Sequence, residues 1–476
     1  QGMMKIVKSG EGKDDEIDNI WFNFVNGISE KLLRRSANSL LKNLSGANLF
    51  DIFSTIGSAG SLYTMLAPYF ISYGIFTKDR KFCRDYLSHA KIEDPDHEGN
   101  ECKIAHFTDT FNEVNGVART LRMQVEVAKS NGKDLTMITC GPDYGTEYVK
   151  TFEPIGEFDM PEYPEITLYY PPILKMLDYC YQQKYTHIHS ATPGPVGLAA
   201  MLISKILKIP HYSTYHTAFP QYAHKLTDDQ AIGELMWKYV IWFYNQTDMV
   251  FVPSHSTGDE LAEKGIKKEK IVFYPRGIDT KRFHPGKRNG FFKKNYRLND
   301  ASFKLLYVGR VSKEKNLALL ASIYKGLVQQ GGDYHLVVVG EGPYLNEMKQ
   351  GLDGYPVTFT GYLKGEDLSQ AYASSDLFFF PSETDTFGNA VLEAQASGLP
   401  VFVTDTGGPK ENMVPGETGI VFNTKDIEKI ISDIGRISRN KKLINMMRRK
   451  AREYVEKRTF ESAYLSNWEY YKSAVQ

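Results

Sequence analysis

Residues 381–409 read PSETDTFGNAVLEAQASGLPVFVTDTGGP, and this stretch decides the fold. Apolar runs at 377–380 and 401–403 lie on either side of a glycine turn and a segment of helix-favouring residues. A strand, a turn, a helix and a second strand form the repeating unit of a parallel sheet with crossover helices. Ligands of such sheets bind beyond the carboxyl ends of the strands, where we expect Asp385 to lie.

The same alternation of strand and helix extends outward from this stretch. One series runs from about residue 103 to about 275, and a second of similar length begins at about 303. Two doubly wound, Rossmann-like α/β domains facing a cleft are the simplest architecture for this pattern. We therefore predict a helical N-terminal extension (1–100), a first domain (101–280), a second domain (281–455) and a C-terminal helix (456–476) packing back toward the first domain.

The composition is that of a soluble globular enzyme, with 42% hydrophobic and 24% charged residues in a chain of 476. Basic and acidic residues both total 57, so no net field favours nucleic acid. The charged, polar start predicts no secretory signal. Four cysteines without metal-type spacing read as reduced thiols in a cytoplasmic protein: Cys83, Cys102, Cys140 and Cys180.

The first hundred residues differ from the rest. Leucines recur at helical spacing beside basic residues over 28–44, and no charged residue occurs from 52 to 76. The second segment is long enough to span a bilayer, but its serines, threonines and glycines lower its hydrophobicity. A buried helical subdomain, a membrane-surface anchor and a true span all stay open, in that order of preference.

Two cations follow the strand expected at 303–308. Arg310 comes directly after Gly309, and Lys315 follows shortly afterwards. Cations at the carboxyl end of a strand can hold a diphosphate and neutralise the charge that builds on a leaving nucleotide. The alternative for such a segment is a solvated helix entry, which becomes less attractive because an acidic pair follows in the same domain.

That acidic pair is Asp385, before the turn, and Glu393, inside the helix. Carboxylates close to backbone N–H groups at a helix start suit a ligand that offers both hydroxyls and phosphate. The small residues of this helix allow the backbone to approach the ligand closely. The alternative is a turn-forming Asp and an exposed helix acid.

The first domain offers weaker candidates. Residues 115–117 (Asn-Gly-Val) lie between a strand and a helix, where glycine permits close backbone approach to a substrate. His216 lies in a loop at the carboxyl end of a strand, a position that favours a polar contact with substrate. His187 and His189 share one face of a strand, but no third ligand lies nearby in the sequence, so we predict no metal site.

Together these residues resemble the family 4 retaining glycosyltransferases, group 1 glycosyltransferases with the GT-B fold, from about residue 103 to the C-terminus. The paired acids of that family are usually Glu-x7-Glu; here Asp385 takes the first place. The resemblance implies that Glu393 binds the ribose hydroxyls, while Asp385 and the turn hold the sugar. It likewise implies a diphosphate clamp of Arg310 and Lys315.

The resemblance also brings His216 close to the donor sugar and Gly116 close to acceptor and phosphate. The implied donor-binding residues are Gly309, Arg310, Lys315, Asp385, Phe387, Gly388, Asn389, Ala390 and Glu393. The implied catalytic residues are His216, Arg310, Lys315 and Asp385. The implied acceptor or phosphate loop is Asn115, Gly116 and Val117.

The implied activity is transfer of a hexose from a nucleotide-diphosphate sugar with retention, without a metal or another cofactor. The stretch 384–389 and the segment 115–122 resemble bacterial phosphatidylinositol mannosyltransferases and diacylglycerol glycosyltransferases. That resemblance implies a lipid or glycan acceptor and peripheral membrane contact through the N-terminal region. A UDP or GDP donor stays open, as do a sugar phosphorylase, a nucleotide-sugar epimerase or a catalytically silent sugar-nucleotide-binding protein.

Overall fold

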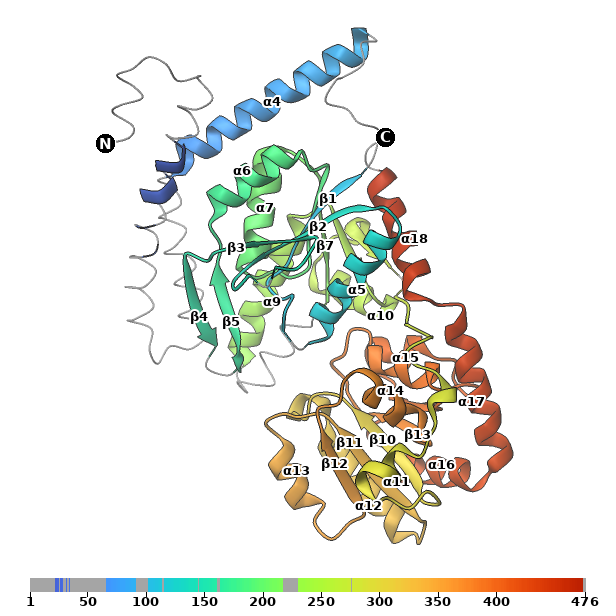
Figure 1. Cartoon of the computed structure of the whole chain (residues 1–476). Helices are drawn as coiled ribbons and strands as arrows, with labels where there is room; N and C mark the ends of the chain where they lie inside the picture. The colour runs from blue at the N-terminus through green and yellow to red at the C-terminus, as the bar shows by residue number, and fades with distance from the viewer. Residues whose placement is uncertain are drawn as a thin grey trace. The chain divides into compact units, whose positions relative to one another are not determined.

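The computed structural model describes residues 22–24, 26–28, 31, 34, 66–90, 102–113, 115–143, 145–160, 163–216, 230–274 and 276–473. By compactness the chain divides into two units. The first unit comprises 1–214, 243–249 and 471–476, and the second comprises 215–242 and 250–470. Figure 1 labels the elements along the chain.

One sheet has seven strands in the order β3-β2-β1-β6-β7-β8-β9. β1 pairs in parallel with β2 on one side and with β6 on the other. Chain order therefore reverses at β1, which is the topological switch point of a doubly wound sheet. The strands are β1 (Lys103–Phe107), β2 (Asp134–Cys140), β3 (Val149–Phe152), β6 (His187–Ser190), β7 (His211–Thr214), β8 (Met249–Val252) and β9 (Ile271–Phe273).

A second sheet has six strands in the order β12-β11-β10-β13-β14-β15. Its pairs are parallel, and chain order reverses at β10, between β11 and β13. Its strands are β10 (Phe303–Val308), β11 (Tyr334–Val339), β12 (Val357–Gly361), β13 (Leu377–Phe380), β14 (Val401–Thr404) and β15 (Gly419–Phe422). An antiparallel hairpin, β4 (Gly156–Met160) and β5 (Tyr163–Tyr170), has no counterpart in the sequence-based expectation.

The helices are α4 (Ala67–Ala90), α5 (Gly116–Ser130), α6 (Ile173–Gln183), α7 (Pro195–Leu207), α9 (Gln230–Asn245), α10 (His255–Lys264), α11 (Phe291–Tyr296), α12 (Leu317–Gln329), α13 (Leu345–Gly351), α14 (Gly365–Ala373), α15 (Asn389–Ala396), α16 (Ile427–Arg439), α17 (Lys441–Glu456) and α18 (Phe460–Ser473). Short 3₁₀ helices are η2 (Lys268–Lys270), η3 (Pro285–Lys287), η4 (Lys313–Lys315) and η5 (Gly408–Asn412).

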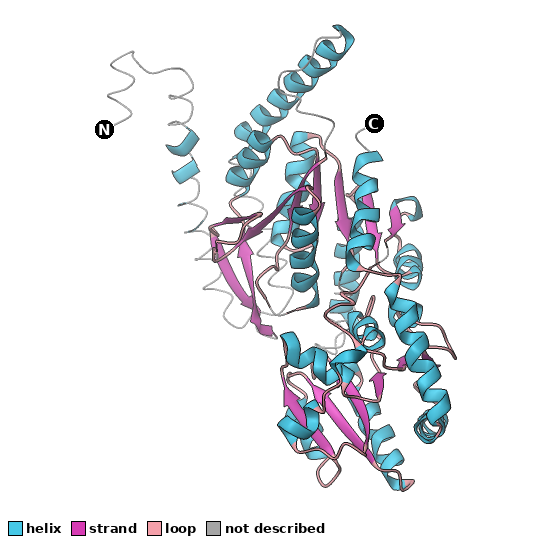
Figure 2. Cartoon of the chain, turned by 45° about the vertical axis from the view of Figure 1, so that its right-hand side comes forward, coloured by secondary structure: helices cyan, strands magenta, loops and turns pink. Residues whose placement is uncertain are grey.

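The second sheet is buried on both faces, as a parallel sheet with crossover helices must be. Alternate residues of its strands enter two separate hydrophobic clusters: Phe378 and Phe380 belong to one, Leu377 and Phe379 to the other. Figure 2 shows helices on either side of these strands. Strand alternation therefore explains why the run at 377–380 is entirely apolar.

α4 packs against α6 and α7 along only part of its length (Figure 1). The Tyr73 hydroxyl donates to Asp178 Oδ1 at 2.7 Å. The Arg80 guanidinium lies 3.8 Å from the Tyr181 ring centroid and donates to the Tyr181 carbonyl at 2.9 Å. These contacts tie the helical N-terminal region to the first sheet's helices.

Among the residues that the structure describes, no helix has the length and apolarity required to cross a bilayer. The charge-free run 52–76 lies outside the described residues as far as residue 65, and the remainder forms the start of α4. The amphipathic segment predicted at 28–44 also lies largely outside the described part of the chain.

Candidate active site

The predicted cations and acids follow two neighbouring strands of the second sheet. Gly309 and Arg310 follow β10, whereas Asp385 follows β13. β10 and β13 pair directly, on the side of β10 where chain order reverses. Because the carboxyl ends of parallel strands meet at one edge, the topology alone brings these residues to the switch point, where ligands of doubly wound sheets bind.

Lys315 and Asp385 form an ion pair at this edge. Lys315 Nζ lies 2.8 Å from Asp385 Oδ2, and the two side chains are only 11% and 22% exposed. Lys315 ends η4, and the following Asn316 takes a left-handed conformation, with φ of 55°, before α12 begins. The structure therefore brings together a cation and a carboxylate that the sequence had assigned to diphosphate and sugar.

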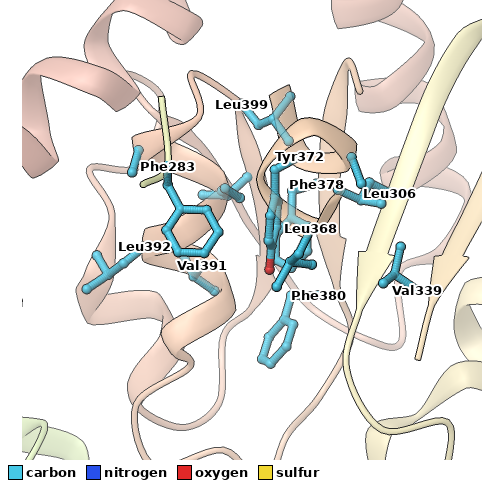
Figure 3. Packing of buried hydrophobic residues seen from close by; sticks show 14 of the residues in the cluster. Phe283, Leu306, Val339, Leu368, Tyr372, Phe378, Phe380, Val391, Leu392 and Leu399 are labelled. Carbon is cyan, nitrogen blue, oxygen red and sulfur yellow. The ribbon is translucent and has the colours of Figure 1, made fainter. Parts of the chain in front are cut away.

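Glu393 lies in α15 and is 3% exposed. Its Oε2 accepts a hydrogen bond of 2.8 Å from the Tyr372 hydroxyl of α14. Figure 3 shows Tyr372 among the apolar side chains of the second unit's core, near Leu368 and Phe378. A buried carboxylate fixed by a donor from the core keeps one orientation, as a residue that grips hydroxyl groups requires.

Two glycine turns press against each other beside Asp385. Gly388 has φ of 78°, a conformation that side chains rarely adopt, and it precedes α15. A Cβ on Gly408 would lie 1.9 Å from the Thr386 carbonyl oxygen, which excludes any side chain there. The Gly408 N–H donates to the Asp385 carbonyl at 3.2 Å. The glycines at 388 and 408 thus hold the turn 385–388 in place.

The turn is also anchored to residues earlier in the chain. The Thr386 hydroxyl donates to the His216 carbonyl at 3.0 Å, and the Ser254 hydroxyl donates to the Thr386 carbonyl at 2.9 Å. His216 is 8% exposed, and its Nδ1 lies 2.6 Å from Arg276 Nη2. The predicted His216 therefore lies beside the predicted turn.

Sequence reasoning missed Arg276, Tyr372 and Glu411. Arg276 follows the short strand β9 and comes before Gly277. Arg310 likewise follows a strand, β10, but comes after its glycine, Gly309. Glu411 accepts from the backbone N–H groups of His255 and Ser256, both at 2.7 Å, at the start of α10. Only the strand-then-cation pattern could have indicated Arg276, and no local signal indicates the other two.

The predicted acceptor loop lies in the first unit, at the carboxyl end of β1, where chain order reverses. Asn115 caps α5, because its side chain accepts from the Ala118 N–H at 2.8 Å. Gly116 and Val117 begin that helix. Nearby, burial raises the pKa of the Asp109 carboxyl to about 6 although Thr192 donates to it at 2.7 Å.

The two histidines of β6 make side-chain hydrogen bonds. His189 bonds to the Thr214 hydroxyl at 2.7 Å and to the Tyr471 hydroxyl at 2.6 Å, and His187 bonds to the Thr186 hydroxyl at 3.0 Å. Within the described ranges, no three residues of the types His, Cys, Asp and Glu lie close enough to hold a metal ion.

Comparison with solved structures identifies the fold. The chain shares its fold with sucrose-phosphate synthase of Thermosynechococcus elongatus, with a TM-score of 0.63, 19% identity, and coverage of 78% of this chain and 99% of that one. The two parallel sheets of this chain and its likeness to this structure show the GT-B fold.

The family follows from sequence. Residues 289–454 match the model for glycosyl transferases group 1, and residues 114–282 match glycosyltransferase family 4. The chain is 32% identical to a GDP-mannose-dependent alpha-mannosyltransferase of Corynebacterium glutamicum, over 67% of this chain and 76% of the relative. The protein belongs to glycosyltransferase family 4.

Two further relatives are similar. Sulfoquinovosyl transferase of Arabidopsis thaliana is 28% identical over 79% of this chain and 74% of its own length. Alpha-monoglucosyldiacylglycerol synthase of Streptococcus pneumoniae is 30% identical over 63% of this chain and 70% of its own. The predicted activity is confirmed: the protein is a retaining glycosyltransferase that takes a hexose from a nucleotide sugar, and the phosphorylase, epimerase and silent-protein alternatives are not favoured.

Proposed function

We propose that the residues at the carboxyl edge of β10 and β13 bind the donor. In this assignment Arg310 and Lys315 contact the diphosphate, Glu393 contacts the ribose, and Asp385 contacts the hexose. The single observation that supports it best is the Lys315–Asp385 ion pair of 2.8 Å. A cation and a carboxylate fixed together place a phosphate contact and a hydroxyl contact side by side, as a sugar diphosphate requires.

The turn 387–390 and Gly309 complete the proposed donor site, and residues 115–117 form the proposed acceptor or phosphate loop. The bond between the anomeric carbon and the diphosphate oxygen breaks, and the acceptor oxygen bonds to that carbon on the same face. The acceptor proton passes to the departing diphosphate. Preorganised cations lower this barrier because they stabilise negative charge as it develops on the leaving group.

The acceptor that we propose is a lipid, and we propose that the hexose is transferred at a membrane surface. One relative is named for a diacylglycerol product. The exposed face of α4 supports the idea. Ile71, Ile75, Phe82 and Tyr86 recur at helical spacing and are 62%, 52%, 69% and 63% exposed.

These four side chains lie on the helix face opposite Tyr73, which packs inward. The exposed Asp79 lies among them at the same spacing, and the exposed Lys78, Lys81 and Asp85 lie beside them. A helix whose exposed apolar side chains point away from its own domain suits a bilayer interface.

Vesicle co-sedimentation tests the membrane part. We expect the full chain to pellet with vesicles of phosphatidylglycerol and phosphatidylcholine, and Ile75→Ser with Phe82→Ser to reduce the pelleted fraction. Tyr362→Ser, which removes another exposed aromatic residue (55%), is the matched control. No binding by the unmodified chain at low salt would contradict peripheral attachment.

Nucleoside diphosphate release tests the transfer. UDP-glucose, UDP-galactose and GDP-mannose are each incubated with diacylglycerol in mixed micelles and with soluble glycan acceptors. We expect one donor to release its diphosphate only when an acceptor is present, and the anomeric proton coupling of the product to match that of the donor. A glycolipid product supports the lipid acceptor, whereas turnover with glycans alone would exclude it.

A further inference from the structure

Arg276 is a buried cation for which the described residues provide no acidic partner. It is 9% exposed. Its Nη2 lies 2.6 Å from His216 Nδ1, and its guanidinium carbon lies 5.2 Å from the ring centroid of Phe387 and 5.8 Å from that of Tyr274. Its Nε is buried and has no hydrogen-bond partner in the part of the chain that the structure describes.

A buried charge with only neutral neighbours is unfavourable, because the desolvation cost is not repaid by an opposite charge. The aromatic faces of Phe387 and Tyr274 and the His216 nitrogen offset part of this desolvation cost. The same chain pairs another sheltered arginine fully: Arg448 lies 2.7 Å from the Asp376 carboxylate. The arrangement at Arg276 is therefore incomplete in a way that an anion would correct.

The position of Arg276 indicates where that anion comes from. Phe387, beneath its guanidinium, belongs to the turn that begins at Asp385, and Asp385 pairs with Lys315. His216, its hydrogen-bond partner, accepts from Thr386 of the same turn. Arg276 thus borders the proposed donor site rather than a separate surface.

We infer that Arg276 is an anion-binding residue of this site and contacts a negatively charged oxygen of the bound substrate. The inference rests on the proposed donor site. Two sources share the required chemistry: the diphosphate of the donor, and a carboxylate or sulfonate carried by the transferred sugar. A guanidinium holds either through two parallel hydrogen bonds.

The contact with Arg276 also determines the tautomer of His216. A guanidinium can only donate, so His216 Nδ1 must accept and the ring proton lies on Nε2. His216 therefore presents an N–H donor, and not a base, at its second nitrogen. This fits a residue that holds a sugar oxygen and leaves proton transfer to the departing diphosphate.

Calorimetric titration of the full chain tests the first source. Arg276→Met removes the charge at similar length, Arg276→Lys keeps it, and Arg439→Gln changes an exposed arginine as the matched control. If the diphosphate is the partner, Arg276→Met weakens binding of UDP or GDP by roughly 10- to 100-fold, as for one charge-assisted hydrogen bond, and Arg276→Lys recovers part of it.

Matched donors test the second source: UDP-glucose against UDP-glucuronic acid, and GDP-mannose against GDP-mannuronic acid. If the sugar carries the anion, Arg276→Met weakens only the acidic member of a pair, by a similar factor, and leaves UDP and GDP binding unchanged. Either pattern supports the inference.

Melting temperature without ligand separates a binding role from a structural one. Since an unpaired buried cation opposes folding, Arg276→Met is expected to melt no lower than the wild type. Unchanged affinity for all six ligands would overturn the inference, and so would a loss of affinity accompanied by a lower melting temperature. If the wild type bound no nucleotide at all, that result would instead contradict the proposed donor site.

Discussion

At the scale of single residues, the sheltered ion pair of Lys315 and Asp385 defines the chemistry. The sequence predicted that both would lie at one sheet edge, because each follows an apolar strand of the same parallel sheet. It did not predict that they touch, nor that Tyr372 holds Glu393. Tyr372 reads as an ordinary core aromatic of a helix, and only the folded structure shows that its hydroxyl donates a hydrogen bond to a carboxylate.

Replacing Lys315 by alanine removes a preorganised cation from the proposed leaving group. We expect kcat to fall by about two orders of magnitude or more. The control is Lys313→Ala: this lysine begins the same 3₁₀ helix, but its side chain is 77% exposed. Steady-state kinetics that show equal turnover for Lys315→Ala and Lys313→Ala would contradict the assignment.

Replacing Tyr372 by phenylalanine leaves Glu393 without the hydroxyl that orients it. The ring stays in the core, so we expect a loss of about 1 kcal/mol in the free energy of unfolding. If Glu393 binds ribose, affinity for the nucleoside diphosphate should fall as well. Chemical denaturation and calorimetry measure the two effects, and a stability loss with unchanged affinity would argue against the ribose contact.

At the scale of elements, the carboxylate of Glu411 at the start of α10 shows how distant segments of the second unit are joined. Both Glu411 oxygens accept from the first N–H groups of α10, where unpaired donors and the helix dipole favour negative charge. Glu411 belongs to η5, directly after the glycine turn that supports Asp385. The cap therefore fixes the position of that turn.

Glu411→Ala should lower the free energy of unfolding by about 1–2 kcal/mol, the usual cost of losing a helix cap. Glu411→Gln keeps an acceptor and should lose less. The exposed Glu417, a few residues further on, supplies the control Glu417→Ala. Urea denaturation curves measure the free energy of unfolding of all three variants. Equal midpoints for Glu411→Ala and Glu417→Ala would show that the cap contributes nothing.

The antiparallel hairpin β4–β5 is the element that sequence reasoning missed. Its strands contain acidic residues and a proline, and they do not show the apolar runs that marked the sheet strands. By contrast, the alternation of strands and helices expected beyond residue 303 is present, and α12, whose apolar residues recur at the helical period, is part of it. Buried parallel strands with continuous apolar runs are easy to recognise, whereas a hairpin without such runs is not.

At the scale of the whole molecule, the two-sheet α/β architecture followed from the alternation of strands and helices, and the GT-B relatives confirm it. The domain boundaries at 100, 280 and 455 stay predictions. The boundary predicted at residue 100 lies outside the described residues. Contacts between segments far apart in sequence, such as Arg276 with Phe387, depend on the folded chain and leave no local pattern to read.

The first sheet should make the protein acid-sensitive. Burial lowers the pKa of His106, His187 and His211 to about 3, 4 and 3, below the value of 6.5 for an unfolded chain. Above pH 6.5 these groups are neutral in both states. As pH falls from 6.5 toward 4 the unfolded chain binds the protons, so stability decreases by about 1.4 kcal/mol per pH unit for each histidine.

Thermal melts between pH 7.5 and 4.5 measure this loss. His106→Gln should flatten the decline below pH 6.5, whereas His89→Gln, at an exposed position of α4, should leave it as in the wild type. A melting temperature that stays constant from pH 6.5 to 5 would show that these histidines are protonated in the folded protein.

One measurement tests the central claim most directly: a crystal structure of the complex with whichever of UDP and GDP binds more tightly. We predict the diphosphate within hydrogen-bond distance of Arg310 and Lys315, and the ribose hydroxyls at Glu393. A nucleotide bound away from the carboxyl ends of β10 and β13, with those three side chains untouched, would contradict the account.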